Sequence, residues 1–460
     1  MARIKRENLT EGSIFKLMIA FVLPVFATSV LQQAFNTADM MILGRFVGDE
    51  AYAAVGSTST IVGLFIEFFL GFSIGANVVI SRFIGNGNAE KSSKAVHSSL
   101  MLALICGSFI ALMGMSLTEP MLRLTHVPEE LVEDATLYLR IYFAGMPFYM
   151  LYNFAAAVFR SVGKTRLPLF CLTVGGALNV VLNAFFVLVL SRGVDGVAMA
   201  TVISNAVSFV LLIGALRRER DDIRFYFGRC RIDKSILWSI IRIGLPSGFL
   251  GSVFSISNLC IQSVVNSLGT KVIAASSSAA NIEIYMQYIG NAFAQACATM
   301  VSQNLGAGKI DRCKRTLATA LSVCMSVTFV ISVVVYILSP YLVKIFTLDE
   351  TVIMYARRRM IYTLLFKVVQ CVMDVTVGAL QGYGRTLVPA SVSMIGVCGL
   401  RLLWIFTVFP MFRSVDALFI VYPITWAIAS VCDLIYFAVC YKKSKQEKQE
   451  EQEKAEGTLT

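Results

Sequence analysis

The sequence predicts an all-α integral membrane protein with twelve transmembrane helices arranged in two pseudo-symmetric six-helix lobes. An apolar composition, a set of long apolar stretches and an internal repeat predict this fold class. The chain has 460 residues, of which 57% are hydrophobic and 15% charged, with a mean hydropathy of +0.71. Soluble domains carry about 25% charged residues. Most of this chain is therefore expected to lie in lipid or against other lipid-buried helices.

Twelve apolar stretches are long enough to cross a bilayer, which requires about 20 helical residues. They cover roughly residues 14–43, 52–80, 94–117, 132–159, 167–190, 195–216, 236–266, 272–303, 314–338, 352–380, 388–410 and 417–441. Several exceed the length that the hydrocarbon core requires. These helices are expected to tilt, kink or project from the bilayer.

A repeat relates the two halves of the chain. The segment 13–24 recurs as 235–246. The segments 81–87 and 160–168 recur in nearly the same register, at 302–308 and 381–389. Six spans return the chain to the side of the membrane from which it started. The two halves are therefore expected to be parallel repeats about an axis along the membrane normal.

These observations predict five regions. They are an N-terminal segment 1–13, a first lobe 14–216, a linker 217–234, a second lobe 235–441 and a polar tail 442–460. The first apolar stretch is too long for the core of a signal peptide, so it is expected to be retained as a transmembrane helix.

The distribution of Lys and Arg predicts the orientation. The linker carries seven basic and four acidic residues, and further basic residues occupy the loops 82–94, 160–166 and 309–315. Basic loops face the cytoplasm, so both termini are expected there, with the protein in the cell membrane. Arg357, Arg358 and Arg359 do not follow this pattern, because they fall near the outer end of the tenth span.

The net charge of +11 does not indicate a nucleic-acid partner, because the basic residues lie in short loops between apolar segments. The eleven cysteines are scattered, mostly within apolar stretches, and form no Cys-x-x-Cys motif. They are expected to pack between helices and not to form a disulfide framework or a metal site. The expected surroundings are the lipid bilayer, and no cofactor is predicted.

Three motifs carry a family resemblance. Residues 39–45 (Asp-Met-Met-Ile-Leu-Gly-Arg) end the first span, residues 75–82 lead into a Gly-x-Gly loop, and residues 160–168 fill the loop between spans four and five. Together with the duplication, from about Ile14 to Tyr441, the chain resembles the multidrug and toxic compound extrusion (MATE) family, and its prokaryotic DNA-damage-inducible branch in particular. The resemblance implies a secondary active transporter, and the chain is expected to function as a monomer. It would exchange organic, often cationic, compounds for H⁺ or Na⁺ through a cleft that opens alternately to each side.

Asp39 is the first candidate for ion coupling. Gln32, Asn36 and Asp39 are spaced so that they share one helical face. Ionisable groups inside a membrane are functional candidates, because their burial is costly. A carboxylate in a partly dry cleft can hold or release a proton. The alternative is an aspartate at the outer interface, since Gly44 and Arg45 follow closely.

The resemblance also points to the fifth span, where family members often carry a second acid. This sequence has Asn179 and Asn183 there, one turn apart and not ionisable. The departure argues against a two-carboxylate site, but asparagine can ligate Na⁺ or accept a hydrogen bond from a protonated Asp39. The predicted ion-coupling residues are Asp39, Asn36, Asn179 and Asn183.

Other polar residues within the spans are candidates for a substrate cavity. They are Gln32, Glu67, Asn258, Gln262, Glu283, Tyr288 and Asp374. Polar stripes also hold membrane helices together, and Asp374 lies two turns after Lys367, with which it could form a charge-neutralising pair. Arg401 is expected to face a partner.

No nucleotide or enzyme motif supports a different function. Gly163-Lys164-Thr165 resembles the end of a P-loop, but that motif requires a glycine where Val158 stands. His-Glu-x-x-His does not occur. The protein is therefore not expected to be an enzyme, and the expected energy source for transport is an ion gradient and not ATP. A flippase for lipid-linked saccharides is the alternative, but it would need a strongly cationic cavity, whereas the predicted intramembrane charges here are mixed.

Overall fold

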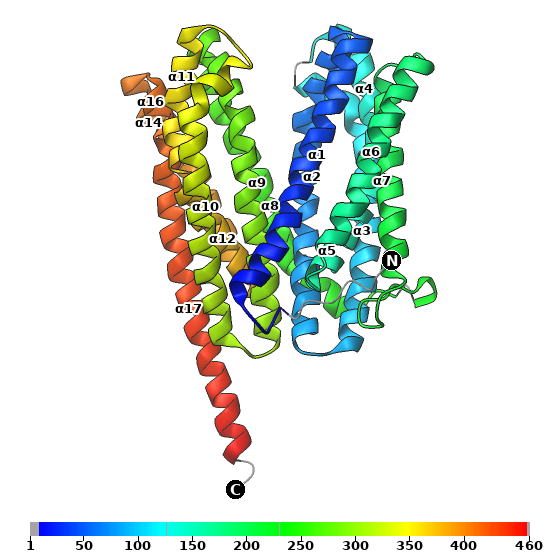
Figure 1. Ribbon diagram of the computed structural model, residues 1–460, viewed down its shortest axis with the longest axis vertical. Coiled ribbons are helices and arrows are strands. Elements are labelled where there is room, and N and C mark those ends of the chain that lie inside the picture. The colour runs from blue at the N-terminus through cyan, green and yellow to red at the C-terminus, as the bar shows by residue number, and fades with distance from the viewer. Residues whose placement is uncertain (1–8, 126, 230, 458–460) are drawn as a thin grey trace. The chain divides into compact units, whose positions relative to one another are not determined.

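The computed structural model describes residues 9–125, 127–229 and 231–457 (Figure 1). Within these ranges the chain is helical and contains no strand. Each of the twelve predicted stretches is a helix or a run of consecutive helical segments. The predicted fold class, all-α with two six-helix lobes, is confirmed. Residues 1–8 of the predicted N-terminal segment and 458–460 of the predicted tail lie outside the described residues.

The helices of the first half are separated by short loops. Their bounds are α1 (Ile14–Ile42), continued by a π-helical turn η1 (Leu43–Val47), α2 (Asp49–Gly85), α3 (Ala89–Leu124), α4 (Glu129–Ala144), α5 (Met146–Ser161), α6 (Arg166–Ala184), continued by η2 (Phe185–Val189), α7 (Val194–Leu216) and a short 3₁₀ turn η3 (Phe227–Arg229).

The helices of the second half follow the same order of spans. Their bounds are α8 (Lys234–Ser267), α9 (Thr270–Gly306), α10 (Ile310–Lys344), α11 (Glu350–Met360), a π-helical turn η4 (Ile361–Leu365), α12 (Lys367–Gly382), α13 (Leu387–Val392), η5 (Ser393–Gly399), α14 (Leu400–Thr407), α15 (Phe409–Phe412), α16 (Val415–Phe419) and α17 (Val421–Gly457).

Eleven of the twelve spans are apolar enough to cross a membrane by length and composition. Ten are single helices or continuous runs, and α4 with α5, bent by 46° at their junction, makes the eleventh. The twelfth, α9, has 37 residues but a lower mean hydropathy, because polar side chains recur along it. These include Ser276, Glu283 and Gln287, which contact other helices of the same half. The polarity of α9 thus reflects its contacts and not a failure to span.

The described chain forms two compact units. Unit 1 covers residues 23–248, and unit 2 covers residues 9–22 and 249–457. The predicted lobes began at residues 14 and 235. The first residues of each predicted lobe belong instead to the other unit: residues 14–22 to unit 2 and residues 235–248 to unit 1. Both exchanges occur next to a proline inside a helix, Pro24 in α1 and Pro246 in α8. A proline removes one backbone hydrogen bond and weakens the helix at that point.

Hydrogen bonds explain why residues 9–22 belong to unit 2. The Asn304 side chain donates to the backbone carbonyl of Leu9 over 3.4 Å, and Lys309 Nζ donates to the carbonyl of Thr10 over 3.0 Å. Leu9 itself is buried. The start of the chain is therefore anchored to the α9–α10 loop.

Glycines hold the first part of α8 in unit 1. Gly71 and Gly75 of α2 face Gly244 and Gly248 of α8. A Cβ on Gly71 would come within 2.2 Å of the Gly248 nitrogen, which no real side chain tolerates. Two Gly-x-x-x-Gly motifs thus let the helix backbones touch, as is common in membrane bundles.

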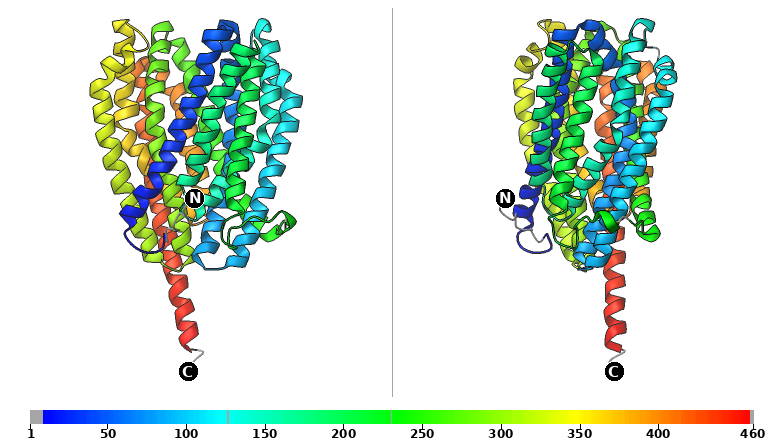
Figure 2. Two further views of the ribbon diagram at one scale, coloured as in Figure 1. Left: turned by 45° about the vertical axis from the view of Figure 1, so that its right-hand side comes forward. Right: turned by 90° about the vertical axis from the view of Figure 1, so that its right-hand side faces the viewer.

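A similar contact joins α12 to α9 in unit 2. A Cβ on Gly378 would come within 2.3 Å of the Ala294 carbonyl oxygen, and one on Gly382 within 2.7 Å of that of Ala298. The last helix, α17, continues beyond these contacts and remains helical to Gly457 (Figure 2). Its exposed end corresponds to the predicted polar tail.

Candidate functional site

Asp39 lies in a cluster of neutral polar side chains in unit 1. Asn183 Nδ2 donates to Asp39 Oδ1 over 2.5 Å, and Thr201 Oγ1 lies 3.3 Å from Asp39 Oδ2. Asn179 Oδ1 accepts from Asn183 over 3.3 Å, and Asn179 Nδ2 donates to Thr201. We call these four residues the Asp39 cluster. It joins the end of α1 to α6 and α7.

Local structure positions the cluster deep in the unit. Asn183 is fully buried and Asn179 is 4% exposed, whereas Asp39 is partly buried. Asp39 and Asn183 each stand just before a π-helical turn, η1 and η2. Such turns often occur at functional sites.

The Asp39 cluster offers oxygen ligands and no counter-charge. Among the described residues, Asp39 has no ion pair, and Asn183 Oδ1 is buried without a hydrogen-bond partner. An unpaired buried carboxylate is costly unless it takes up a proton or a cation. Carboxylate, amide and hydroxyl oxygens are suitable ligands for hard cations. The cluster can therefore hold either H⁺ or Na⁺.

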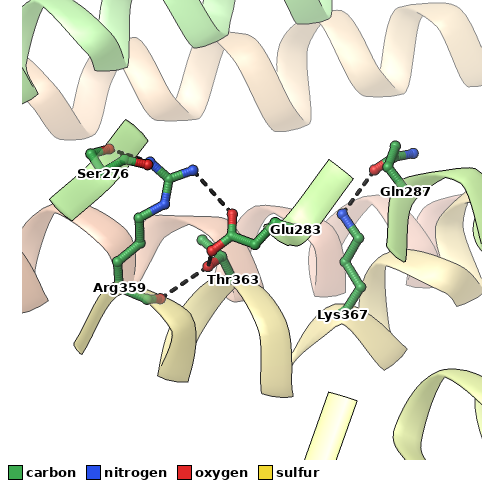
Figure 3. Close-up of polar contacts among 6 residues, drawn as sticks. All are labelled: Ser276, Glu283, Gln287, Arg359, Thr363 and Lys367. Atoms are coloured by element: carbon green, nitrogen blue, oxygen red, sulfur yellow. Dashed lines mark hydrogen bonds and ion pairs between the residues drawn. The ribbon is translucent and has the colours of Figure 1, made fainter. Parts of the chain in front are cut away.

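Unit 2 holds its buried acid differently. Glu283 of α9 accepts a hydrogen bond from Arg359 Nη2 over 3.0 Å and another from the Thr363 hydroxyl (Figure 3). Arg359 also donates to the backbone carbonyl of Ser276 over 3.1 Å and to its hydroxyl. We call these four residues the Glu283 network. Both charged side chains are nearly enclosed, with 13% of Arg359 and 11% of Glu283 exposed.

Gln287 connects a second acid and base one turn further along α9. Lys367 Nζ donates to Gln287 Oε1 over 2.8 Å, and Gln287 Nε2 donates to Asp374 Oδ2 over 3.3 Å. Figure 3 shows Lys367 pointing to Gln287, beside the Glu283 network. Lys367 and Asp374 form no direct ion pair in the described structure. Gln287 contacts both charged side chains and thus connects the two residues for which a charge-neutralising pair was one of the expected alternatives.

Three cationic side chains of unit 2 lie over aromatic rings at the end of α16 and the start of α17. Arg359 is 5.1 Å from the ring centre of Phe419, Arg401 is 4.2 Å from that of Tyr422, and Lys367 is 5.7 Å from that of Trp426. Arg401 also donates to the Thr425 hydroxyl over 3.4 Å, which provides the partner expected for it. Ring faces attract cations, more strongly when water is excluded. The ring contacts therefore help to stabilise the positive charges of Arg401 and Lys367, which form no ion pair among the described residues, and add to the ion pair of Arg359.

The remaining predicted site residues belong neither to the Asp39 cluster nor to the Glu283 network. Asn36 is exposed and makes no hydrogen bond to the Asp39 cluster, and Gln32 is partly buried on the same helix. Glu67 is exposed and, among the described residues, has no hydrogen-bond partner. In unit 2, Asn258 is exposed, Gln262 donates to Asn266 on its own helix over 2.9 Å, and Tyr288 stacks edge-on with Tyr285.

Sequence reasoning missed several functional candidates. Thr201 completes the Asp39 cluster, and Arg359 and Thr363 hold Glu283. Asp433 of α17 is fully buried, and neither carboxylate oxygen has a hydrogen-bond partner. A signal for Asp433 existed, since it is a lone acid in the apolar stretch 417–441. No such signal existed for Arg359, because the sequence does not show which face of the Arg359 helix packs against α9.

Comparison with known proteins decides the family. The family model MatE matches residues 24–185 and, a second time, residues 246–407. The chain belongs to the MatE family. The two matches begin at the repeated prolines, Pro24 and Pro246, which confirms the internal duplication. MatE proteins are membrane transporters and not enzymes.

Relatives and solved structures of MatE proteins cover three quarters or more of the chain. "Probable multidrug resistance protein YoeA" of Bacillus subtilis is 25% identical over 448 residues, which are 95% of this chain and 96% of YoeA. "Probable multidrug resistance protein YpnP" of the same organism is 26% identical over 75% of this chain and 77% of its own. The crystal structure of MATE in complex with MaL6 matches with a TM-score of 0.89 at 21% identity, over 96% of this chain and all of that chain. At this identity the structural match shows the fold.

Proposed function

We propose that this MatE protein is a secondary active exporter that exchanges organic cationic or neutral compounds for H⁺ or Na⁺. The Asp39 cluster carries the proposal. Its carboxylate is partly buried and has only neutral partners, so the charge of the cluster changes when an ion binds or leaves. A ligand that binds one state better shifts the equilibrium between an outward-open and an inward-open form. The names of YoeA and YpnP support a drug-like substrate.

The charges of unit 2 favour coupling in unit 1. Glu283 is already neutralised by Arg359 at 3.0 Å, and Asp374 is linked through Gln287 to Lys367. Binding a further cation there would require breaking contacts with a built-in cation. Asp39 has no such competitor among the described residues.

The alternative of a flippase for lipid-linked saccharides receives less support. Such a protein needs exposed cations to hold a pyrophosphate. The cations of unit 2 are instead stacked on rings and hidden, with 8% of Lys367 and 2% of Arg401 exposed.

The proposal includes an orientation in the cell membrane. The linker 217–234 and the loops 82–94, 160–166 and 309–315 carry the basic residues, so they and both termini would face the cytoplasm. Reporters fused after Arg166, Lys234 and Lys314 should read cytoplasmic, and those near Glu130 and Asp349 external. An external signal from the linker would contradict this arrangement.

Reconstitution into liposomes tests the function. Purified protein should move ethidium, an organic cation, under an imposed H⁺ or Na⁺ gradient without ATP. Asp39→Asn should abolish this coupled movement, because the amide keeps the shape but cannot take up a proton, and Asp39→Glu should keep part of it. Asp49→Asn, an exposed acid in the first turn of α2, is the matched control and should behave as wild type.

The gradients also decide between the two ions. Movement driven by only one of the separately imposed gradients identifies the coupling ion. Wild-type export by Asp39→Asn under a proton gradient would contradict coupling at Asp39, and Glu283 and Asp374 would be tested next. ATP-dependent movement with dissipated gradients would contradict secondary active transport.

A further inference from the structure

The linker is folded onto unit 1 and does not hang free. His97 of α3 accepts a hydrogen bond from the Tyr226 backbone N–H at Nε2 (3.1 Å), and its Nδ1 lies 2.8 Å from the Ser93 carbonyl oxygen. The Phe225 ring stacks on the His97 ring with centres 5.2 Å apart. The Asp233 N–H donates to a hydroxyl of α3 over 3.0 Å. The linker therefore has a defined shape beside the end of α7, as the green loop in Figure 1 shows.

This shape forms an open cavity of about 480 Å³. Its lining combines two guanidinium groups with three aromatic rings. The lining residues are Arg217, Arg224, Phe225, Tyr226, Phe227 and Gly228, which we call the linker pocket.

Both arginines are held in place by rings of the pocket itself. The Arg217 guanidinium carbon is 5.1 Å from the centre of the Phe227 ring, and that of Arg224 is 4.9 Å from the centre of the Tyr226 ring. Stacking leaves the edge of a guanidinium, which carries its N–H donors, available for another group. Two such edges in one cavity suit an anion with several oxygens.

The nearby acids do not cancel this charge. Glu219 is paired with Lys164 over 2.6 Å. Asp221 accepts a hydrogen bond from the Tyr226 hydroxyl over 2.6 Å and lies 3.9 Å from Arg224. Arg217 has no ion-pair partner among the described residues. Neither Glu219 nor Asp221 therefore neutralises Arg217, which adds a positive charge to the lining of the pocket.

The pocket lies where a transmembrane helix ends. Arg217 directly follows the last residue of α7 (Val194–Leu216), which is a membrane span by length and composition. Phe227 is 63% exposed, although it is a large apolar residue. Exposed aromatic rings and basic residues at the end of a span are typical of the level of the lipid headgroups.

We propose that the linker pocket binds the phosphate headgroup of an anionic phospholipid. Arg217 and Arg224 would donate hydrogen bonds to the phosphate oxygens, an arrangement that the planar guanidinium favours. The exposed Phe227 ring would lie against the acyl chains beside it. A soluble phosphate has the same oxygens but lacks the chains, so the two sources can be distinguished. The site is independent of ion coupling and of the transported compound.

Lipid-dependent stability of the purified full chain tests this proposal. The melting temperature is measured in neutral detergent with increasing phosphatidylglycerol, with phosphatidylcholine, and with glycerol 1-phosphate as a headgroup without chains. Phosphatidylglycerol should raise the melting temperature in a saturable way, and the other two should not. In Arg217→Gln/Arg224→Gln the apparent affinity should fall at least roughly tenfold, since the loss of a single hydrogen bond between two charged groups already weakens binding by about this factor.

Two further variants separate the pocket from general charge and from misfolding. Arg218→Gln/Arg220→Gln removes the same charge from the same linker but leaves the lining intact, and should bind as wild type. Phe227→Ala keeps both charges and removes the ring under Arg217, and should weaken binding by a smaller factor. Its melting temperature in phosphatidylcholine shows whether the fold is intact.

Three results would overturn the proposal. Equal weakening in the Arg218/Arg220 control would mean diffuse attraction and not a site. Equal stabilisation by phosphatidylcholine would mean that the headgroup charge is not recognised. Equal stabilisation by glycerol 1-phosphate would assign the pocket to a soluble anion.

Discussion

The Asp39 cluster of unit 1 and the corresponding place in unit 2 contain different chemistry. In the register of the repeated prolines, Pro24 and Pro246, Asp39 of the same helix corresponds to Ile261. In the register that aligns segment 160–168 with 381–389, Asn179, Asn183 and Thr201 correspond to Leu400, Trp404 and Tyr422. Ile261 belongs to a buried hydrophobic cluster that includes Phe419, and Trp404 and Tyr422 pack against it. The same position thus holds hydrogen-bonded polar groups in one unit and apolar packing in the other.

The charged groups of unit 2 occupy other positions, which are not repeated in unit 1. Glu283 and Arg359 correspond to Val62 and Tyr138 in the same register. The duplication therefore repeats the spans, the prolines and the loops, but not the buried charges of Glu283 and Arg359. One acid is partnered by amides and a hydroxyl, and the other by a guanidinium. We infer that Asp39 is free to exchange ions and that Glu283 is structural.

The largest effect is expected on breaking the Glu283–Arg359 pair. Glu283→Gln should lower the stability of the purified protein by roughly 3–5 kcal/mol, because it leaves a buried guanidinium without its counter-charge. Thermal unfolding in detergent measures this loss. Glu283→Gln/Arg359→Met should recover most of it, and Asp39→Asn should stay within about 1 kcal/mol of wild type. A larger loss in Asp39→Asn than in Glu283→Gln would reverse the assignment of roles.

A smaller effect, on transport, is expected from making the Asp39 cluster resemble unit 2. Asn183→Leu removes the hydrogen bond from Asn183 to Asp39, and export in liposomes should fall roughly tenfold, since a hydrogen bond to a charged group contributes about 1.5–3 kcal/mol. Asn183→Asp should be tolerated and should change the preference between H⁺ and Na⁺. Wild-type export by Asn183→Leu would show that the amide only fills space.

Substitution of Asp433 gives a third test, in which we expect a small gain in stability and not a loss. Its carboxylate is fully buried in unit 2 without a hydrogen-bond partner, whereas Asp39 has two. Asp433→Leu should therefore raise stability by about 1 kcal/mol, because it removes an uncompensated polar group. Thermal unfolding again provides the measurement. Destabilisation would mean that Asp433 has a partner in the membrane.

The smallest effect is expected at Asp233, just before α8. The backbone N–H of Ile236, the Ser235 hydroxyl and the Ser235 N–H all donate to its carboxylate and hold the pKa of Asp233 below its ordinary value. A lowered pKa stabilises the folded protein at neutral pH, and this stabilisation is lost as the pH falls through the folded-state pKa. Asp233→Ala should melt slightly earlier than wild type at pH 7, with a difference that disappears in acid. A difference that persists in acid would indicate that the charge is not involved.

The sequence predicted the spans well, because hydropathy and the repeat depend on local composition. It also placed Asn183 beside Asp39 through the family resemblance. Thr201 was not predicted because threonines are common in membrane helices, and its helical phase relative to α1 cannot be read from spacing. Arg359 was left without a role for a related reason. The π-helical turn η4 follows it, so the face that α11 and α12 present to α9 depends on an irregularity that the sequence does not show.

Each compact unit contains a segment from the other half of the chain: residues 235–248 lie in unit 1 and residues 9–22 in unit 2. This affects what happens when the linker is cut. Among the described residues, the chain passes between the units within α1 and α8, near Pro24 and Pro246, while the described part of the linker 217–234 lies in unit 1. A protease that nicks the linker would not release one half from the other, because the glycine contacts of α2 still hold the start of α8. The two fragments would remain interlocked and should co-purify. The protein could therefore be produced as two separately encoded polypeptides, split in the very segment that looks like its connector.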